Sequence, residues 1–108
     1  MHNRWHQIIG MSANRLVLEA IALRKCVLAT YNRMRVTLAP HILYTKHDEM
    51  FVDAVTIERE GQPPREIKFG TFKLAGLKDV ALEDRPFEPN PEFDPAQDKY
   101  DGVTLFTV

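Results

Sequence analysis

The stretch from Leu23 to Leu82 decides the fold of this chain, because it reads as a series of short strands that are each closed by a turn signal. Close-spaced strands after a single helix predict a small curled sheet or barrel, a scaffold that commonly binds ligands or partners. The strand runs are CVLATY (26–31), MRVTLAP (34–40), HILYT (41–45), MFVDAVTI (50–57), REIKFGTF (65–72) and LKDVAL (77–82).

Turn-forming residues separate these runs. Asn32-Arg33 is a candidate tight turn, and Lys46-His47-Asp48-Glu49 is a candidate hairpin tip. Gly61-Gln62-Pro63-Pro64 separates the fourth run from the fifth. Pro40 has no N–H to donate to a neighbouring strand, so we expect it at a strand edge or at a break between two strands.

A helical pattern precedes the strands. Leu16, Ala20 and Leu23 recur at helical spacing, and Ser12 is a candidate N-cap. The spacing predicts a helix from about Ala13 to Arg24.

The chain changes character after Glu83. Prolines alternate with acids and aromatics in RPFEPNPEFDP (85–95), a pattern that fits neither a helix interior nor a central strand. We expect an ordered arm that Phe87 and Phe93 anchor on the sheet. The last run, VTLFTV (103–108), predicts a terminal strand that pairs either with its own sheet or with a second subunit.

Together these patterns predict one mainly β domain, in which a small β-barrel follows one N-terminal α-helix and precedes an extended Pro-rich C-terminal arm. A chain of 108 residues supports one hydrophobic core. We divide it into a loosely ordered leader over residues 1–11, with Met11 as an alternative start to Met1, a helix-plus-barrel domain over 12–82, and an acidic arm with the terminal strand over 83–108.

The composition is that of an ordinary globular protein, with 44% hydrophobic and 27% charged residues. No apolar run approaches the ~18 residues that span a bilayer, and Arg4, His6 and Gln7 interrupt any secretory signal. The one cysteine, Cys26, excludes an internal disulfide and is expected to be a buried, inert thiol. We therefore predict a cytoplasmic protein with no membrane partner.

The net charge of −1 is unevenly spread along the chain. Residues 1–46 hold seven Lys or Arg and one acid, residues 47–82 hold five against seven, and residues 83–108 hold two against seven. A basic first half suits an anion or a nucleic acid backbone. The alternative is that the acidic C-terminal region folds back and neutralises it.

No catalytic constellation is visible, so we predict a protein that is not an enzyme and that uses no cofactor and no metal. His2 and His6 have a zinc-like spacing but lack a third ligand. The acids Asp48, Glu49 and Asp53 invite comparison with an acid–base pair. Asp48 and Glu49 are better explained as residues of a solvated hairpin tip.

A set of tyrosines and basic residues is the best candidate for a binding surface. Aromatic faces beside guanidinium groups suit bases and phosphates, through stacking and bidentate hydrogen bonds. The alternative is that the tyrosines are ordinary strand residues and the arginines are solvated, and for His41 a structural role competes with a ligand contact. The candidate ligand-binding residues are Tyr31, Arg33, Arg35, His41, Tyr44, Arg65 and Lys68.

Over roughly residues 20–94 the chain resembles the WYL domain of bacterial regulators. AIALRKCVLATY is similar to the family's helix, basic stretch and strand ending in Tyr, and RVTLAPHILY to its approach to Pro and the strand after it. PFEPNPEFD is similar to its proline–aromatic tail. REIKFGTF falls on an arginine-bearing stretch in which Arg65 matches the family's arginine.

The chain also departs from the family pattern. Met50-Phe51-Val52 replaces the Trp-Tyr-Leu triplet, and Gly70-Thr71 replaces an Asp-Arg pair, which removes one anion contact. Another family arginine would fall on Val36, four residues before Pro40, and Arg35 lies one residue further away.

The resemblance implies an SH3-like, Sm-related β-barrel that senses a small molecule or a nucleic acid, usually behind a helix-turn-helix domain. One N-terminal helix is too little for such a domain, so we expect a stand-alone module. The hypothesis is a non-enzymatic regulatory module in transcriptional regulation, which binds a nucleotide or single-stranded nucleic acid and acts through a regulatory protein partner or as a homodimer. The alternative is a protein–protein interaction or dimerisation module without a small-molecule ligand.

Overall fold

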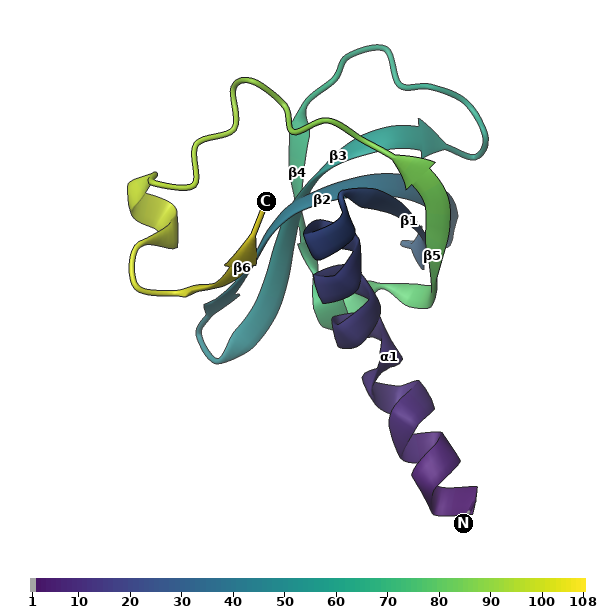
Figure 1. Cartoon of the computed structure of the whole chain (residues 1–108). Helices are drawn as coiled ribbons and strands as arrows, with labels where there is room; N and C mark the ends of the chain where they lie inside the picture. Colours follow the sequence, from purple (N-terminus) through teal and green to yellow (C-terminus); the bar gives the residue numbers. More distant parts are fainter. Residues whose placement is uncertain (1) are drawn as a thin grey trace.

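The computed structural model describes residues 2–108, with side chains from Ala13 onward. One helix and an antiparallel six-stranded sheet make the fold mainly β, as predicted (Figure 1). Two short 3-10 helices, η1 (Leu74–Gly76) and η2 (Asp98–Tyr100), lie in the connections. The main elements are α1 (His2–Leu23), β1 (Lys25–Tyr31), β2 (Met34–Lys46), β3 (Glu49–Arg59), β4 (Phe69–Lys73), β5 (Lys78–Pro86) and β6 (Thr104–Thr107).

The strands follow the order β4-β3-β2-β1-β5, and β6 pairs with the C-terminal half of β2. Among the described residues, the end strands β4 and β5 do not pair with each other, so strand pairing does not close the sheet. The terminal strand therefore pairs with its own sheet, which decides between the two options that the sequence left open. No helix among the described residues is long and apolar enough to cross a membrane.

Two tight hairpins confirm the predicted turns. Asn32 and Arg33 have φ of 50° and 65°, and His47 and Asp48 have φ of 52° and 63°. Two consecutive residues with positive φ form the type I′ turn, whose twist matches that of the flanking strands. The two turns fix the registers of β1 with β2 and of β2 with β3.

The prediction of a break at Pro40 is wrong, because MRVTLAP and HILYT form the single strand β2. Pro40 is opposite Ala54 of β3, and Ile42 is opposite Asp53, so His41 is an extra residue in β2. Such a β-bulge tolerates a residue that donates no backbone hydrogen bond. The extra residue also shifts the alternation of β2. Before the bulge even-numbered side chains such as Leu38 face the inner core, and after it odd-numbered ones such as Leu43 do so.

Three predicted boundaries were also wrong. The helix begins at His2 rather than near Ala13, so Ser12 lies within it. Residues 2–12 contain no proline that would end the helix earlier. The strand β4 begins only at Phe69, because Pro63 and Pro64 hold the preceding residues in a loop. The strand β5 continues past Leu82 to Pro86, where its last residue pairs with Lys25. The side chains of the predicted leader lie outside the described residues.

The sheet has two covered faces. The inner face packs against α1, with a core that includes Val17, Ile21, Leu38, Leu43, Val52 and Phe72. The outer face carries two smaller clusters, one around Cys26 and Val55 and one around Ile42 and Tyr44. Residues 87–103, here called the C-terminal segment, supply Phe87, Phe93 and Tyr100 to these outer clusters.

The helix is held by one apolar stripe, which gives a direct test of the packing. Ile21 is 1% exposed in the inner core, whereas Leu18 on the same helix is 43% exposed. We predict that Ile21→Ala lowers the free energy of unfolding by about 3 kcal/mol. Leu18→Ala should change it by less than about 0.5 kcal/mol, as measured by urea denaturation. Equal losses for the two variants would contradict the assigned inner face.

Candidate functional site

A buried carboxylate forms the polar centre of the outer face. Asp53 is 2% exposed in the middle of β3, between the inner-face residues Val52 and Ala54. Strand alternation turns its side chain to the outer face, toward β4 and the C-terminal segment. A buried charge of this kind is stable only when paired and hydrogen-bonded.

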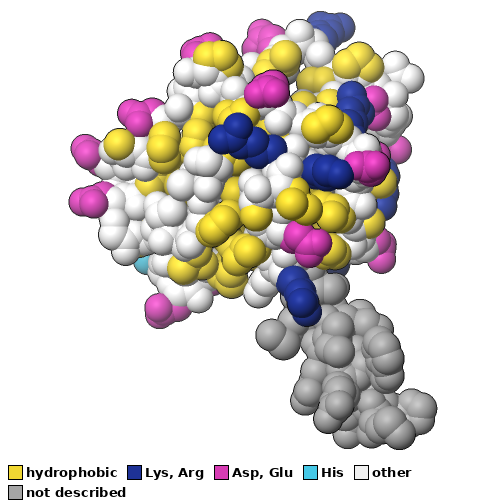
Figure 2. Space-filling view, viewed as in Figure 1, with side chains coloured by type: hydrophobic (Ala, Val, Ile, Leu, Met, Phe, Trp, Pro, Cys, Tyr) yellow, Lys and Arg dark blue, Asp and Glu magenta, His cyan; other side chains and the backbone are white. Residues whose placement is uncertain are grey.

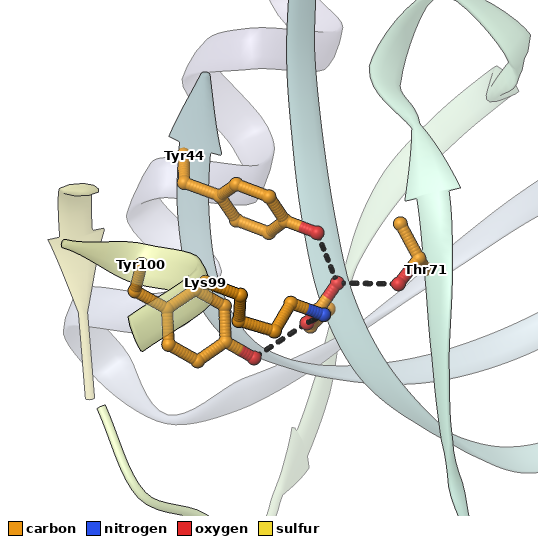
Figure 3. Close-up of polar contacts among 5 residues, drawn as sticks. Tyr44, Thr71, Lys99 and Tyr100 are labelled. Atoms are coloured by element: carbon orange, nitrogen blue, oxygen red, sulfur yellow. Dashed lines mark hydrogen bonds and ion pairs between the residues drawn. The ribbon is translucent and has the colours of Figure 1, made fainter. Parts of the chain in front are cut away.

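Four donors meet this requirement (Figure 3). Oδ1 of Asp53 accepts hydrogen bonds from the hydroxyls of Tyr44 (2.7 Å) and Thr71 (2.8 Å). Oδ2 accepts one from the Lys99 ammonium (2.8 Å) and one from the Tyr100 hydroxyl (2.5 Å). A carboxylate has about four acceptor positions, so both oxygens are fully used.

The contacts also set the ionisation of the group. Burial by itself raises the pKa of Asp53, but the hydrogen bonds from Lys99 and the three hydroxyls outweigh burial and hold the pKa below its ordinary value. Burial and the adjacent carboxylate raise the pKa of Tyr100 and of Tyr44. Asp53 is therefore ionised and both phenols are neutral at physiological pH.

A buried histidine forms a second anchor on the same face. His41 is 1% exposed, at the bulge of β2. Its Nδ1 donates to the carbonyl of Ala39 (2.8 Å), and its Nε2 accepts the N–H of Asn90 (3.0 Å). The ring contacts Phe69, Phe87 and Phe93, with centroids 4.8–5.2 Å apart. Burial lowers the pKa of His41, so the neutral imidazole that these bonds require is favoured.

Together, Asp53 and His41 fasten the C-terminal segment to the sheet. Lys99 and Tyr100 of the segment reach Asp53, and Asn90 and Phe93 reach His41. Phe87 and Phe93, the two predicted anchors, both contact the His41 ring. Of the two readings of His41, these contacts support the structural one, because both ring nitrogens are already used.

A cationic pocket lies where β3 ends and β4 begins. This loop pocket has a volume of about 630 Å³ and lies beside the β3–β4 loop, residues 60–68. Three basic residues and one acid line it, and two phenylalanines form part of its apolar wall. These residues are Arg59, Arg65, Lys68, Glu66, Phe69 and Phe72.

A second pocket of about 510 Å³ lies on the outer face, next to Asp53. This hairpin-tip pocket is bounded by the ends of β2 and β3, by Thr71 of β4 and by Lys99 of η2. Its remaining lining residues are Tyr44, Lys46, His47 and Phe51. Gly70 and Phe72 line the loop pocket and Thr71 lines this one, so successive residues of β4 contribute to two different pockets.

The structure brings only part of the predicted binding set together. Arg65 and Lys68 share the loop pocket, while Tyr44 lines the hairpin-tip pocket. Arg35 donates to Thr30 Oγ1 and to the carbonyl of Asp79, so its guanidinium links neighbouring strands.

The other members of the predicted set lie apart. Tyr31 packs edge-on against Phe72 at 5.0 Å, and Arg33 is exposed in the β1–β2 turn. The seven residues therefore do not form one surface.

Sequence reasoning missed the residues around Asp53. The available signal was Asp53 itself, a charge within the apolar run MFVDAVTI, since charged side chains are rarely buried without partners. Its partners Thr71, Lys99 and Tyr100 come from distant positions, and nothing local to their sequence marks them.

Cys26 and the candidate metal ligands can also be placed. Cys26 is buried, and burial raises the pKa of its thiol, which favours the inert form that the sequence predicted. Within the described part of the chain, no three His, Cys, Asp or Glu residues lie together as a metal site would require. The side chains of His2 and His6 are outside that part.

The charged regions of the chain remain largely separate in the fold. Figure 2 shows acidic side chains along the edge that the C-terminal segment forms, and both basic and acidic ones over the middle and the opposite side. Between residues 1–46 and 83–108, as far as the side chains are described, only Lys25 and Asp84 form an ion pair. The acidic region therefore does little to neutralise the basic one through direct contacts.

No protein-family model, curated protein or solved structure matches this chain. The function must therefore be inferred from the geometry of the pockets.

Replacing the central carboxylate should destabilise the protein. Asp53→Asn removes the charge that Lys99 pairs with and turns an amide N–H₂ toward donors, so we predict a loss of about 2–4 kcal/mol in the free energy of unfolding. Asp101→Asn changes an exposed acid next to Tyr100 and should have little effect. Urea denaturation at pH 7 measures both, and equal stabilities of the two variants would contradict the role given to Asp53.

Acidification should weaken the fold in two stages. The pKa of His41 is lowered by folding, so the unfolded chain takes up the proton first, and stability declines as pH falls below the ordinary value of 6.5. The pKa of Asp53 is also lowered, so a further loss begins near 3.8. We predict that His41→Gln flattens the first stage in unfolding measurements between pH 7.5 and 5. The same slope in the variant and the wild type would contradict this assignment.

Proposed function

We propose that this protein is a non-enzymatic binding module for an anionic ligand, a nucleotide or single-stranded nucleic acid, and that it acts in transcriptional regulation. The observation that carries the proposal is the loop pocket, where three basic side chains and two phenylalanine rings line one cavity of about 630 Å³. Cations suit the phosphates of such a ligand, and phenyl rings suit its bases.

The charge of the loop pocket favours an anion. Arg59, Arg65 and Lys68 face a single carboxylate, that of Glu66. The Lys68–Glu66 pair is long at 3.9 Å, and both side chains are more than three-quarters exposed, so it neutralises Lys68 only weakly. An arginine provides two parallel N–H donors to a phosphate, which adds geometric specificity to the attraction.

The backbone near Arg65 is partly preordered. Arg59 and Gln62 exchange two backbone hydrogen bonds, of 2.8 and 3.0 Å, which close the turn at the end of β3. Gly61 takes the φ of 78° that this turn needs, and Pro63 and Pro64 then limit the freedom of the chain before Arg65. A preordered loop loses less entropy on binding a ligand.

The wall of the loop pocket explains one departure from the WYL pattern. A Cβ atom at Gly70 would lie 3.1 Å from the Phe72 ring, so the aspartate of the family does not fit here unless that ring moves. The glycine keeps Phe72 in place as a pocket wall. A base that stacks on Phe69 or Phe72 would then take over part of the recognition that the missing Asp-Arg pair gives in the family.

The resemblance to WYL domains supports the regulatory part of the proposal. We assign the curled sheet to the SH3-like, Sm-related barrels, and the C-terminal segment to an extended Pro-rich arm on its outer face. The helix followed by antiparallel strands agrees with this assignment. Action through a regulatory protein partner or as a homodimer, and a cytoplasmic location, complete the proposal.

An interaction module is the second candidate function. The observation that favours it is the exposure of Leu105 (49%) and Phe106 (37%) on β6, at the margin of the sheet. Apolar side chains on a short strand suit a contact with another protein. Their number is small, and neither lines the loop pocket or the hairpin-tip pocket, so we rank this function second.

Removing one arginine tests the proposed ligand site. We predict that Arg65→Ala weakens the binding of a fluorescent single-stranded oligonucleotide by roughly tenfold, as expected for a charge-assisted contact of ~1.5 kcal/mol. Polarisation measurements at fixed salt give the affinity, and circular dichroism checks the fold.

A matched variant controls for the general loss of positive charge. Arg15→Ala removes an exposed arginine from α1, outside both pockets, and should reduce binding much less. Similar losses of affinity for Arg15→Ala and Arg65→Ala would show non-specific charge attraction and would contradict a ligand site at Arg65. If neither an oligonucleotide nor a mononucleotide binds the wild type, the interaction module replaces the proposal.

A further inference from the structure

The hairpin-tip pocket carries chemistry that the proposed function does not use. It lies on the outer face of the sheet, its lining includes no residue of the loop pocket, and its volume is about 510 Å³. Its lining includes three basic side chains and no carboxylate, and they come from a strand end, a turn and the C-terminal segment. These residues are Lys46, His47 and Lys99.

The carboxylate behind the wall of this pocket already accepts its full number of hydrogen bonds. Asp53 lies behind the wall at 2% exposure, and its two oxygens accept four hydrogen bonds, three of them from the lining residues Tyr44, Thr71 and Lys99. Asp53 therefore offers no acceptor to the pocket. Asp53 offsets the positive charge of Lys99. The lining keeps the charge of Lys46, which has no ion pair among the side chains described from Ala13 onward.

Lys99, which donates to Asp53, is held in place by its contacts. Its ammonium lies 5.7 Å from the centroid of the Tyr44 ring and 5.1 Å from that of Tyr100, and it donates to Asp53 at 2.8 Å. An ammonium has three N–H donors, so Lys99 keeps donors for a ligand, and its side chain is 46% exposed. Ordering it in advance lowers the entropy that binding would cost.

The pocket also has an apolar wall. Tyr44 and Phe51 stack with their ring centroids 6.0 Å apart, and both line the cavity. Tyr44 is buried, whereas Phe51 is only half-buried and leaves part of its ring to the cavity. A compact anion near the lysines would place an attached organic group close to this ring.

We infer that the hairpin-tip pocket is a second anion site, which binds a phosphate group through Lys46, Lys99 and His47. Lysine binds phosphate as a point charge and needs no fixed planar geometry, which suits an open pocket at a hairpin tip. The site is independent of the loop pocket, because the two cavities share no lining residue.

Titration of the full chain with inorganic phosphate and with adenosine 5′-monophosphate tests this site. We expect saturable shifts of the backbone amide NMR signals of Lys46, His47 and Thr71. Lys46→Gln should weaken this binding by roughly threefold, the effect of one partly exposed charge. Tighter binding of the nucleotide identifies a phosphorylated organic ligand, and equal binding identifies free phosphate, so both results support a phosphate site.

Two control variants separate this site from general charge attraction and from the loop pocket. Lys78→Gln removes an exposed lysine of β5 that lines neither pocket and should leave the affinity unchanged. Arg65→Ala should also leave the shifts at Lys46 and Thr71 unchanged, so the inference stands or falls separately from the proposed function. No saturable shift at these amides, or equal affinity in Lys46→Gln and the wild type, would overturn it.

Discussion

The structure depends on how one buried charge is satisfied. Asp53 is a carboxylate in the middle of the sheet, and no side chain of its own strand contributes to the four hydrogen bonds that stabilise it. Two donors come from β2 and β4, and two from η2, far away in the chain. Leaving a buried charge without partners is strongly unfavourable, so the charge of Asp53 favours the docking of the C-terminal segment on the sheet.

The same constraint shapes both faces of the sheet near β4. On the outer face, the bonds to Asp53 hold Tyr44, Thr71 and Lys99 as one wall of the hairpin-tip pocket. On the inner face, the neighbouring residues Gly70 and Phe72 line the loop pocket. A strand whose alternate side chains are fixed by the network on one face and by the core on the other is a rigid support for the two pockets.

Local patterns in the sequence predicted the elements well, but not what joins them. The two tight turns, the strands β1 and β3 and the anchoring phenylalanines follow from neighbouring residues alone. The continuity of β2 through Pro40 does not, because it depends on a bulge that pairing with β3 and the contacts of His41 stabilise. Of the candidate binding residues, Arg65 and Lys68 line one pocket, as their closeness in sequence allows, while the partners of Asp53 depend on the tertiary fold.

Amide hydrogen exchange in Asp53→Asn tests the docking of the C-terminal segment most directly. Three amides report on it, because the N–H groups of Thr45, Asn90 and Val108 bond to Val103 O, His41 Nε2 and His41 O. We predict that the variant lowers the protection of these amides more than that of the amides of α1 from Val17 to Ile21. Unchanged protection at Thr45, Asn90 and Val108 would contradict the dependence of the docked segment on Asp53.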